Sequence, residues 1–143
     1  MSISEVLQAK GNDVITVAES ALLSEAADVL SKNRIGAVVI LDAEGTVAGI
    51  LSERDIVREV GKRGGAVLSE SVDSMMTTTI VTCQKGDGAD DVLQKMTDGR
   101  FRHMPVMEGD EMVGLITLGD VVKARLSQLA MEKQALEGMI MGH

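Results

Sequence analysis

Two spacings of apolar residues run along this chain, and each predicts a different kind of element. A continuous apolar run at 37–41 predicts a buried central strand, and the apolar stretch at 47–51 predicts a second strand that forms a hairpin with it. Residues 20–33 carry apolar side chains at the spacing of one helix face. With a β-branched stretch at 14–17 and a helix that starts near Ser52, the first half reads strand, helix, strand, strand, helix.

The second half of the chain repeats this order. A shift of 66 residues places Val14–Val17 on Ile80–Cys83, and a one-residue deletion in the hairpin turn then lowers the shift to 65. The corresponding elements are expected at 79–83, 88–98, 103–107 and 111–116, with a last helix from about 118. Matched positions in a constant order predict a tandem repeat.

The predicted fold class is α/β (α+β), with two β-α-β-β-α repeats packed as a pseudo-twofold module. We expect the first repeat, with an N-terminal helix or strand, at 1–66 and the second at 67–126, with an inter-repeat linker at 67–78. A helical extension is expected at 127–143. Because units of about 60 residues bury little surface alone, the two repeats are expected to share one core.

Composition narrows the function classes. The net charge is −8 and Phe101 is the only aromatic residue, which argues against nucleic acid as a partner, since that needs a basic patch or a stacking platform. The longest uninterrupted apolar run is far shorter than a bilayer span, and no signal peptide begins the chain, so we expect a soluble cytoplasmic protein without a membrane partner. Cys83 is the only cysteine, and the sequence places no second histidine or cysteine at a metal-ligand spacing from His103, so no metal is predicted.

One short phrase occurs in both repeats, as GILSERD at 49–55 and GLITLGD at 114–120. Each phrase ends a predicted strand and opens a predicted helix, with a hydroxyl residue followed three positions later by aspartate. Such residues serve as plain helix caps and first-turn acids. They also suit an anion at the helix N-terminus and a ribose diol held by a carboxylate. The phrase alone leaves both interpretations open.

The ordered set of motifs resembles a tandem pair of CBS domains, also called a Bateman module, over about residues 8–126. The resemblance rests on four segments: GILSERDIV at 49–57, GLITLGDVV at 114–122, RFRHMPVME at 100–108 and TTTIVT at 77–82. It implies a regulatory module that dimerises into a disc and binds an adenosyl ligand in clefts between the two repeats. AMP is the first choice, and ADP, ATP, NAD and S-adenosylmethionine are alternatives.

The expected ligand-binding residues lie at strand ends and helix starts of both repeats. They are Thr16, Gly36, Ala37, Val38, Ser52, Arg54, Asp55, Thr82, Arg102, His103, Met104, Pro105, Thr117 and Asp120.

Within this set, the aspartates suit the ribose, and the hydroxyl residues Ser52 and Thr117 suit the phosphate. The cations Arg54, Arg102 and His103 also suit the phosphate. Adenine is expected in slots formed by Thr16, Thr82, Val38 and Met104. Alternatively, the arginines are solvated or form edge ion pairs, and the threonines simply favour strands.

No residues are arranged as a nucleophile with its base, so we do not expect an enzyme. The alternative to a ligand sensor is a ligand-free protein–protein scaffold with an unidentified client. A homodimer is expected, built around Ile56, Val57, Val121 and Val122. The last helix adds a coiled-coil-like seam, formed by Val122, Leu126, Leu129, Lys133, Leu136 and Ile140.

Overall fold

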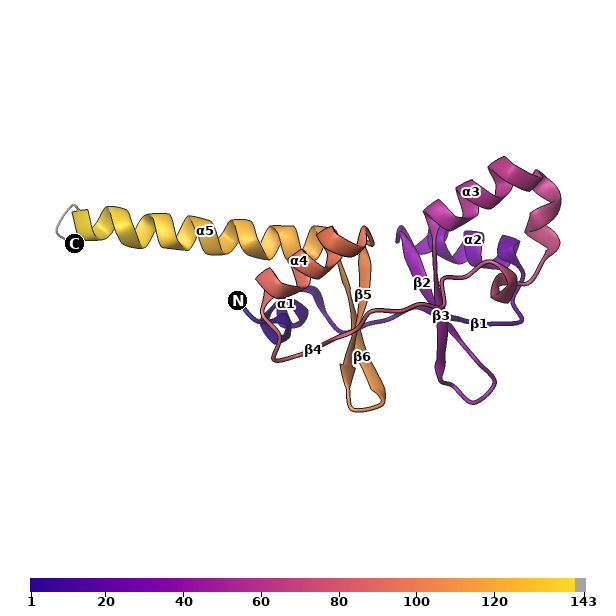
Figure 1. The fold of residues 1–143 in the computed structure, drawn as a ribbon, viewed down its shortest axis with the longest axis horizontal. Helices are drawn as coiled ribbons and strands as arrows, with labels where there is room; N and C mark the ends of the chain where they lie inside the picture. The colour runs from indigo at the N-terminus through magenta and orange to yellow at the C-terminus, as the bar shows by residue number, and fades with distance from the viewer. Residues whose placement is uncertain (141–143) are drawn as a thin grey trace. The chain divides into compact units, whose positions relative to one another are not determined.

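A computed structural model describes residues 1–140, so His143 and the last residues of the extension expected at 127–143 lie outside the described residues. The chain forms two compact units. One unit is Val14–Ile80, and the other combines Met1–Asp13 with the chain from Val81 onward. Figure 1 labels the elements of each unit.

The Val14–Ile80 unit contains a three-stranded sheet in the order β1-β2-β3. β1 pairs in parallel with β2, and β2 pairs antiparallel with β3. The strands are β1 (Thr16–Ala18), β2 (Ala37–Leu41) and β3 (Val47–Ser52), and the helices are α2 (Leu23–Asn33) and α3 (Glu53–Arg63), followed by the 3-10 helices η1 (Gly65–Ser69) and η2 (Val72–Ser74).

The other unit has the same strand arrangement, with β4 parallel to β5 and β5 antiparallel to β6. Its elements are α1 (Ile3–Lys10), β4 (Cys83–Gln84), α4 (Ala89–Gly99), β5 (His103–Glu108), β6 (Glu111–Thr117) and α5 (Leu118–Ile140). The predicted mixed α and β class, with its repeated order of elements, is confirmed.

The strand predicted at 79–83 is much shorter than expected. Only Cys83 and Gln84 pair with β5. Thr77, two residues before the predicted strand, pairs with β3 instead. Thr77 and Ile50 exchange two backbone hydrogen bonds of 2.9 and 3.0 Å in the Val14–Ile80 unit.

The buried side chains form two clusters, one in each unit. Val67, Val72 and Met75, from the linker expected at 67–78, are buried in the cluster of the Val14–Ile80 unit. Ile3, Val6 and Leu7 of α1 are buried in the other cluster. The compact units therefore divide the chain differently from its sequence repeats, because the segments that precede the two repeats each cover a core.

Val121 also belongs to a core. It is 0% exposed and packs in the cluster that contains α1, so it cannot line a dimer surface as we expected.

The glycine that begins the repeated phrase, Gly49 in one unit and Gly114 in the other, lies close to another segment of its own unit. A Cβ on Gly49 would lie 2.7 Å from Met76 Sδ and 2.8 Å from the Thr77 carbonyl oxygen. A Cβ on Gly114 would lie 2.7 Å from Leu7 Cδ2. In each unit a segment from outside the hairpin crosses the glycine closely. At Gly49 a backbone carbonyl blocks any side chain, whereas at Gly114 the obstacle is the movable end of the Leu7 side chain.

Gly49→Ala should lower the free energy of unfolding by about 1–3 kcal/mol, since the new methyl group meets a backbone carbonyl that cannot rotate away. Urea denaturation measures the change. Gly61→Ala is the matched control, because a Cβ on the helical Gly61 would meet no other atom within 4 Å, and this change should stabilise the protein by about 0.5–1 kcal/mol. Equal effects of the two substitutions would contradict the close approach at Gly49.

Candidate ligand-binding site at the strand–helix junctions

The two repeated phrases form the same hydrogen-bonded junction between a strand and a helix. At the β3–α3 junction, the Asp55 N–H donates to Ser52 Oγ at 3.3 Å and the Ser52 N–H donates to Asp55 Oδ2 at 2.9 Å. At the β6–α5 junction, the Asp120 N–H donates to Thr117 Oγ1 at 3.1 Å and the Thr117 N–H donates to Asp120 Oδ2 at 2.9 Å. These reciprocal bonds are capping boxes, so the capping role of all four residues is confirmed.

The Asp55 carboxylate is closed by its own helix. Its Oδ2 also accepts a hydrogen bond from the Ser52 hydroxyl at 3.1 Å, and its Oδ1 lies 3.0 Å from Nη2 of Arg58. The side chain of Asp55 is only 9% exposed. Both oxygens therefore already have partners, and the Ser52 hydroxyl proton is used as well.

The Asp120 carboxylate is more open. Lys10 Nζ lies 2.6 Å from Asp120 Oδ2, and the same ammonium group donates to the Leu115 carbonyl at 2.7 Å. The hydrogen bond from Thr117 also ends on Oδ2, so none of these contacts uses Oδ1. The side chain of Asp120 is 24% exposed. Oδ1 is therefore the carboxylate oxygen that is best placed to accept from a ligand.

Lys10 also affects the charge of this carboxylate. Partial burial raises the pKa of Asp120, but the hydrogen bond from Lys10, the Thr117 hydrogen bonds and the lysine charge together lower that pKa below its usual value. Asp120 is therefore ionised at neutral pH, as a carboxylate that accepts from ribose hydroxyls must be.

Two predicted cationic residues lie beside the β6–α5 junction. His103 is the strand partner of Thr117, and the Leu118 N–H donates to the Arg102 carbonyl at 2.8 Å. The equivalent positions in the other unit are the small residues Ala37, the strand partner of Ser52, and Gly36, which accepts from the Glu53 N–H at 2.9 Å. Only the β6–α5 junction thus combines an open carboxylate with neighbouring cationic residues.

The remaining predicted site residues differ in accessibility. Val38 and Met104 are 0% exposed within the two cores, and Ala37 and Pro105 are also buried. Thr16 in β1, Thr82 just before β4 and Arg54 in the first turn of α3 are exposed.

Lys10 is the site residue that sequence reasoning missed. It lies 110 positions before Asp120, and no local spacing connects the two. Arg58 was also missed, although its place three residues after Asp55 on a helix is a recognisable ion-pair signal.

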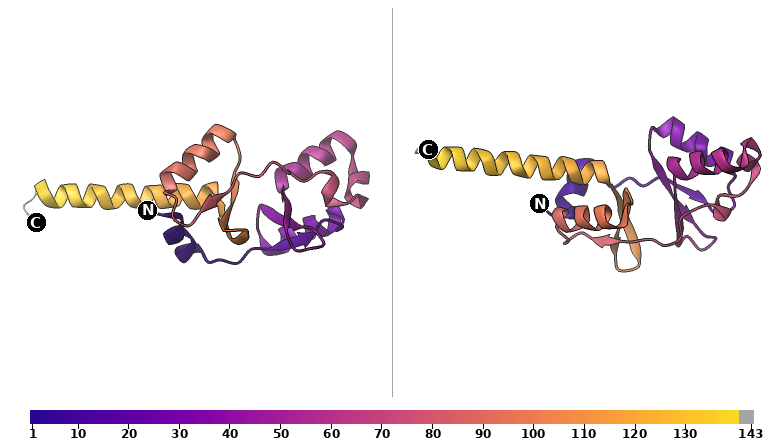
Figure 2. Two further views of the ribbon diagram at one scale, coloured as in Figure 1. Left: turned by 60° about the horizontal axis from the view of Figure 1, so that its bottom comes forward. Right: turned by 45° about the horizontal axis from the view of Figure 1, so that its top comes forward.

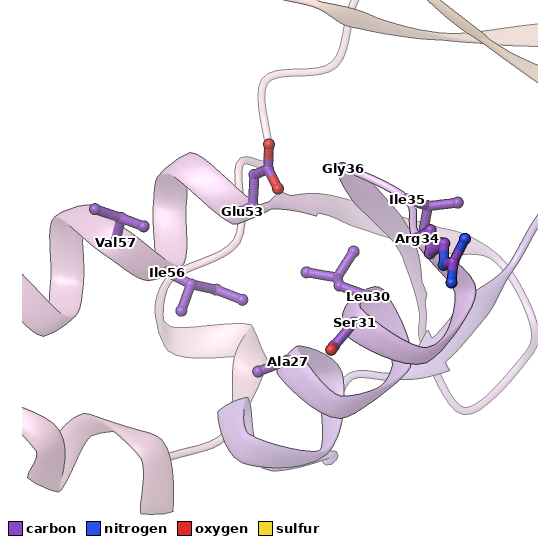
Figure 3. Close-up of a pocket in the computed structure, with 9 residues that line it drawn as sticks. All are labelled: Ala27, Leu30, Ser31, Arg34, Ile35, Gly36, Glu53, Ile56 and Val57. Carbon is purple, nitrogen blue, oxygen red and sulfur yellow. The ribbon is translucent and has the colours of Figure 1, made fainter.

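A separate groove lies between α2 and α3, with a volume of about 500 Å³. Figure 3 shows that most of its wall is aliphatic, with Arg34 and Glu53 among its polar residues. Its lining residues are Ala27, Leu30, Ser31, Arg34, Ile35, Gly36, Glu53, Ile56 and Val57. Because neither Ser52 nor Asp55 lines it, this groove suits an apolar partner surface better than a phosphate.

Residues 1–140 contain no cluster of three or more His, Cys, Asp or Glu side chains that could hold a metal ion. None of the helices in this range is both long enough and apolar enough to cross a membrane.

Lys10→Met should make the protein less stable at neutral pH, because it removes the cation that favours ionised Asp120. The folded-state pKa of Asp120 is depressed, so its contribution is present above the unfolded pKa of about 4 and is lost as pH falls through the folded value. Urea unfolding from pH 7 to pH 2 should therefore show the variant and the wild type converging in acid. A Lys32→Met control removes an exposed helix pair and should change stability by less than about 0.5 kcal/mol at any pH. A difference for Lys10→Met that persists in acid would contradict the ion-pair role.

Comparison with known proteins identifies the family. The CBS domain family matches this chain twice, at residues 3–62 and 72–127. The crystal structure of the CBS-domain containing protein ATU1752 from Agrobacterium tumefaciens is 46% identical, covers 87% of this chain and 99% of its own, and superposes with a TM-score of 0.85. The CBS domain protein PAE2072 from Pyrobaculum aerophilum, solved complexed with AMP, is 27% identical, covers 92% of this chain and 99% of its own, and has a TM-score of 0.78.

Curated relatives agree with this assignment. The CBS domain-containing protein CBSX3, mitochondrial, of Arabidopsis thaliana is 29% identical over 149 residues, which cover 99% of this chain and 72% of that protein. The chain spans only 22% of another relative from the same plant, CBSCBSPB5. The two family matches, the repeated junctions and the likeness to solved structures lead to one conclusion: this chain belongs to the CBS domain family and carries two CBS domains in tandem.

Proposed function

We propose that this protein is a regulatory module that binds an adenosyl ligand, with AMP as the first choice, at the β6–α5 junction. The observation that carries this proposal is the open Asp120 carboxylate, which keeps Oδ1 unused beside Arg102 and His103. The AMP complex of the 27% identical PAE2072 supports the same ligand class. Binding would be passed on through dimer geometry or a partner protein.

In this proposal each part of the nucleotide meets a group of matching chemistry. Ribose hydroxyls donate to Asp120 Oδ1, and the phosphate lies at the N-terminus of α5 beside the Thr117 hydroxyl. Arg102 and His103 supply positive charge to the phosphate. These cationic residues favour AMP, ADP, ATP or NAD over S-adenosylmethionine, which carries no phosphate.

The β3–α3 junction is a weaker candidate for a second ligand. Asp55 would have to exchange its bond with Arg58 for one with the ribose. The Arg58 side chain is 47% exposed and can move away without a rearrangement of the core, and Arg54 supplies an exposed cation nearby. We propose that any binding at Ser52 and Asp55 is weaker than at Thr117 and Asp120.

A ligand-free interaction scaffold is the second candidate function, and the α2–α3 groove favours it. The groove is largely aliphatic, and Val57 at its wall is 71% exposed. We propose that this face, with Ile56 and Val57, contributes to a homodimer, which leaves any client protein to other surfaces. Val57→Glu should then lower the molecular mass measured by light scattering, because a buried carboxylate would break this contact.

Asp120→Ala should weaken AMP binding by about 10- to 150-fold, which corresponds to the loss of a charge-assisted contact worth about 1.5–3 kcal/mol. Isothermal titration calorimetry measures the affinity. Asp55→Ala is the matched control, because it removes the equivalent cap from the closed junction, and it should change AMP affinity by less than about threefold. Urea unfolding of both variants separates loss of binding from loss of stability.

Two outcomes would overturn the proposal. If Asp120→Ala binds AMP as the wild type does, the carboxylate is only a helix cap. If AMP, ADP, ATP, NAD and S-adenosylmethionine all fail to stabilise the wild type, the scaffold is favoured, since a ligand at 100 times its dissociation constant should add about 2.7 kcal/mol.

A further inference from the structure

The second half of α5 adds nothing to the buried core of its own unit, and it touches that unit only near its start, where Arg125 Nε lies 3.5 Å from Asp90 Oδ1 and the Met1 ammonium group lies 3.5 Å from Gln128 Oε1. Ala124 is the last buried residue of the helix, and no residue at 125–140 is buried. Figures 1 and 2 show this half of α5 running beyond α4 and α1 in every view. We call residues 125–140 the arm.

The arm carries large apolar side chains in water. Exposure is 62% for Leu126, 43% for Leu129, 58% for Leu136 and 76% for Ile140. A single helix of this length is marginally stable in water without tertiary contacts. An exposed apolar stripe on such a helix indicates an interaction site.

These side chains lie on one stripe, and the stripe faces away from the helix's own core. Val122, Leu126, Leu129, Leu136 and Ile140 follow alternating steps of four and three, with Lys133 completing the series. At 100° per residue the stripe lies about 130° around the helix axis from the buried face formed by Val121 and Ala124. A second helix can therefore pack on the stripe without displacing α4 or α1.

We propose that the arm pairs with the arm of a second copy of this chain, in antiparallel orientation. The two-fold axis that relates the two copies then places every seam residue opposite a seam residue of the second copy. Val122 faces Ile140, Leu126 faces Leu136 and Leu129 faces Lys133, and each layer occurs twice. The Lys133 stem packs on Leu129 while its ammonium group reaches water.

The charges beside the seam select this direction. In the antiparallel pair Lys123 lies beside Glu137 of the second copy, and the symmetry makes this contact twice. In a parallel pair the two Lys133 side chains would share one layer, and Glu132 would lie beside Glu137 of the second copy. Like charges repel at both places, so the parallel pair is disfavoured.

This inference does not depend on nucleotide binding. It also differs from the contact proposed at Ile56 and Val57, because the arm and α3 belong to different units of the chain. A client helix or the protein's own surface could cover the stripe instead, and the experiment distinguishes these occupants.

Disulfide trapping tests both the partner and the direction. Leu126→Cys and Leu136→Cys are made separately, mixed under reducing conditions, oxidised and analysed on non-reducing gels. In the antiparallel pair the two copies of position 126 are ten residues apart along the axis, about 15 Å, which no disulfide can bridge. We therefore expect a covalent dimer from the mixture and none from either variant alone.

Two controls exclude other cross-links. Wild-type protein should stay monomeric on the gel, because Cys83 is buried and burial, as the largest cause, raises the pKa of its thiol to about 11. Met131→Cys places a thiol on the arm but away from the seam, so it should also give no covalent dimer.

Charge exchange gives a second readout on the same gel. Adding Glu137→Lys to both cysteine variants turns the two attractive contacts between Lys123 and Glu137 into repulsive ones. Pairing of the arms should then be about 2- to 30-fold weaker, and the yield of mixed dimer should fall. Adding Lys123→Glu as well should restore the yield. In a parallel pair Glu137→Lys would instead relieve repulsion from Glu132 and strengthen pairing.

Three results would overturn the inference. Covalent dimers from each single variant alone would show a parallel pair. Absence of any cross-link would show that a client or the protein's own surface covers the stripe. A yield that Glu137→Lys leaves unchanged would show that the arms meet without the proposed register.

Discussion

Reciprocal hydrogen bonds between a hydroxyl residue at the end of a strand and an aspartate three residues later set how strand and helix meet in both halves of this protein. They satisfy N–H groups that a helix start would otherwise leave without partners, and they fix the direction in which each helix leaves its sheet. Ser52 and Asp55 do this for α3, and Thr117 and Asp120 do it for α5. The candidate ligand groups are thus first of all structural groups.

The source of the nearby cation makes the two junctions chemically different. Arg58 comes from the same helix as Asp55 and covers its second oxygen, while Lys10 comes from α1 and approaches Asp120 on the oxygen that Thr117 already uses. A capping carboxylate serves a ligand most readily where one oxygen remains available. This condition, rather than the repeated phrase itself, separates a cap from a candidate site.

The apolar surfaces that remain exposed belong to helices. The α2–α3 groove and the arm of α5 each present aliphatic side chains to solvent, although their own units have complete cores. A groove accepts a partner by shape, whereas the arm has a regular seam that complements itself under a two-fold axis. The assembly surfaces and the ligand site that we propose are therefore on different parts of the molecule.

The sequence by itself determined the tandem repeat, the order of elements, most of their bounds and the two junctions, because apolar spacing and capping act between residues close in the chain. The strand at 37–41 and the helix start after Ser52 were predicted on these grounds and are present in the structure. Tertiary structure alone decided that α1 covers the second sheet's core, that Val121 is buried and that Thr77 pairs with β3. It also decided that Lys10 meets Asp120, since contacts between residues distant in the chain depend on which surfaces pack together. The contact that covers the second oxygen of Asp55 comes from Arg58, only three residues away, and its place on the helix gave a signal in the sequence.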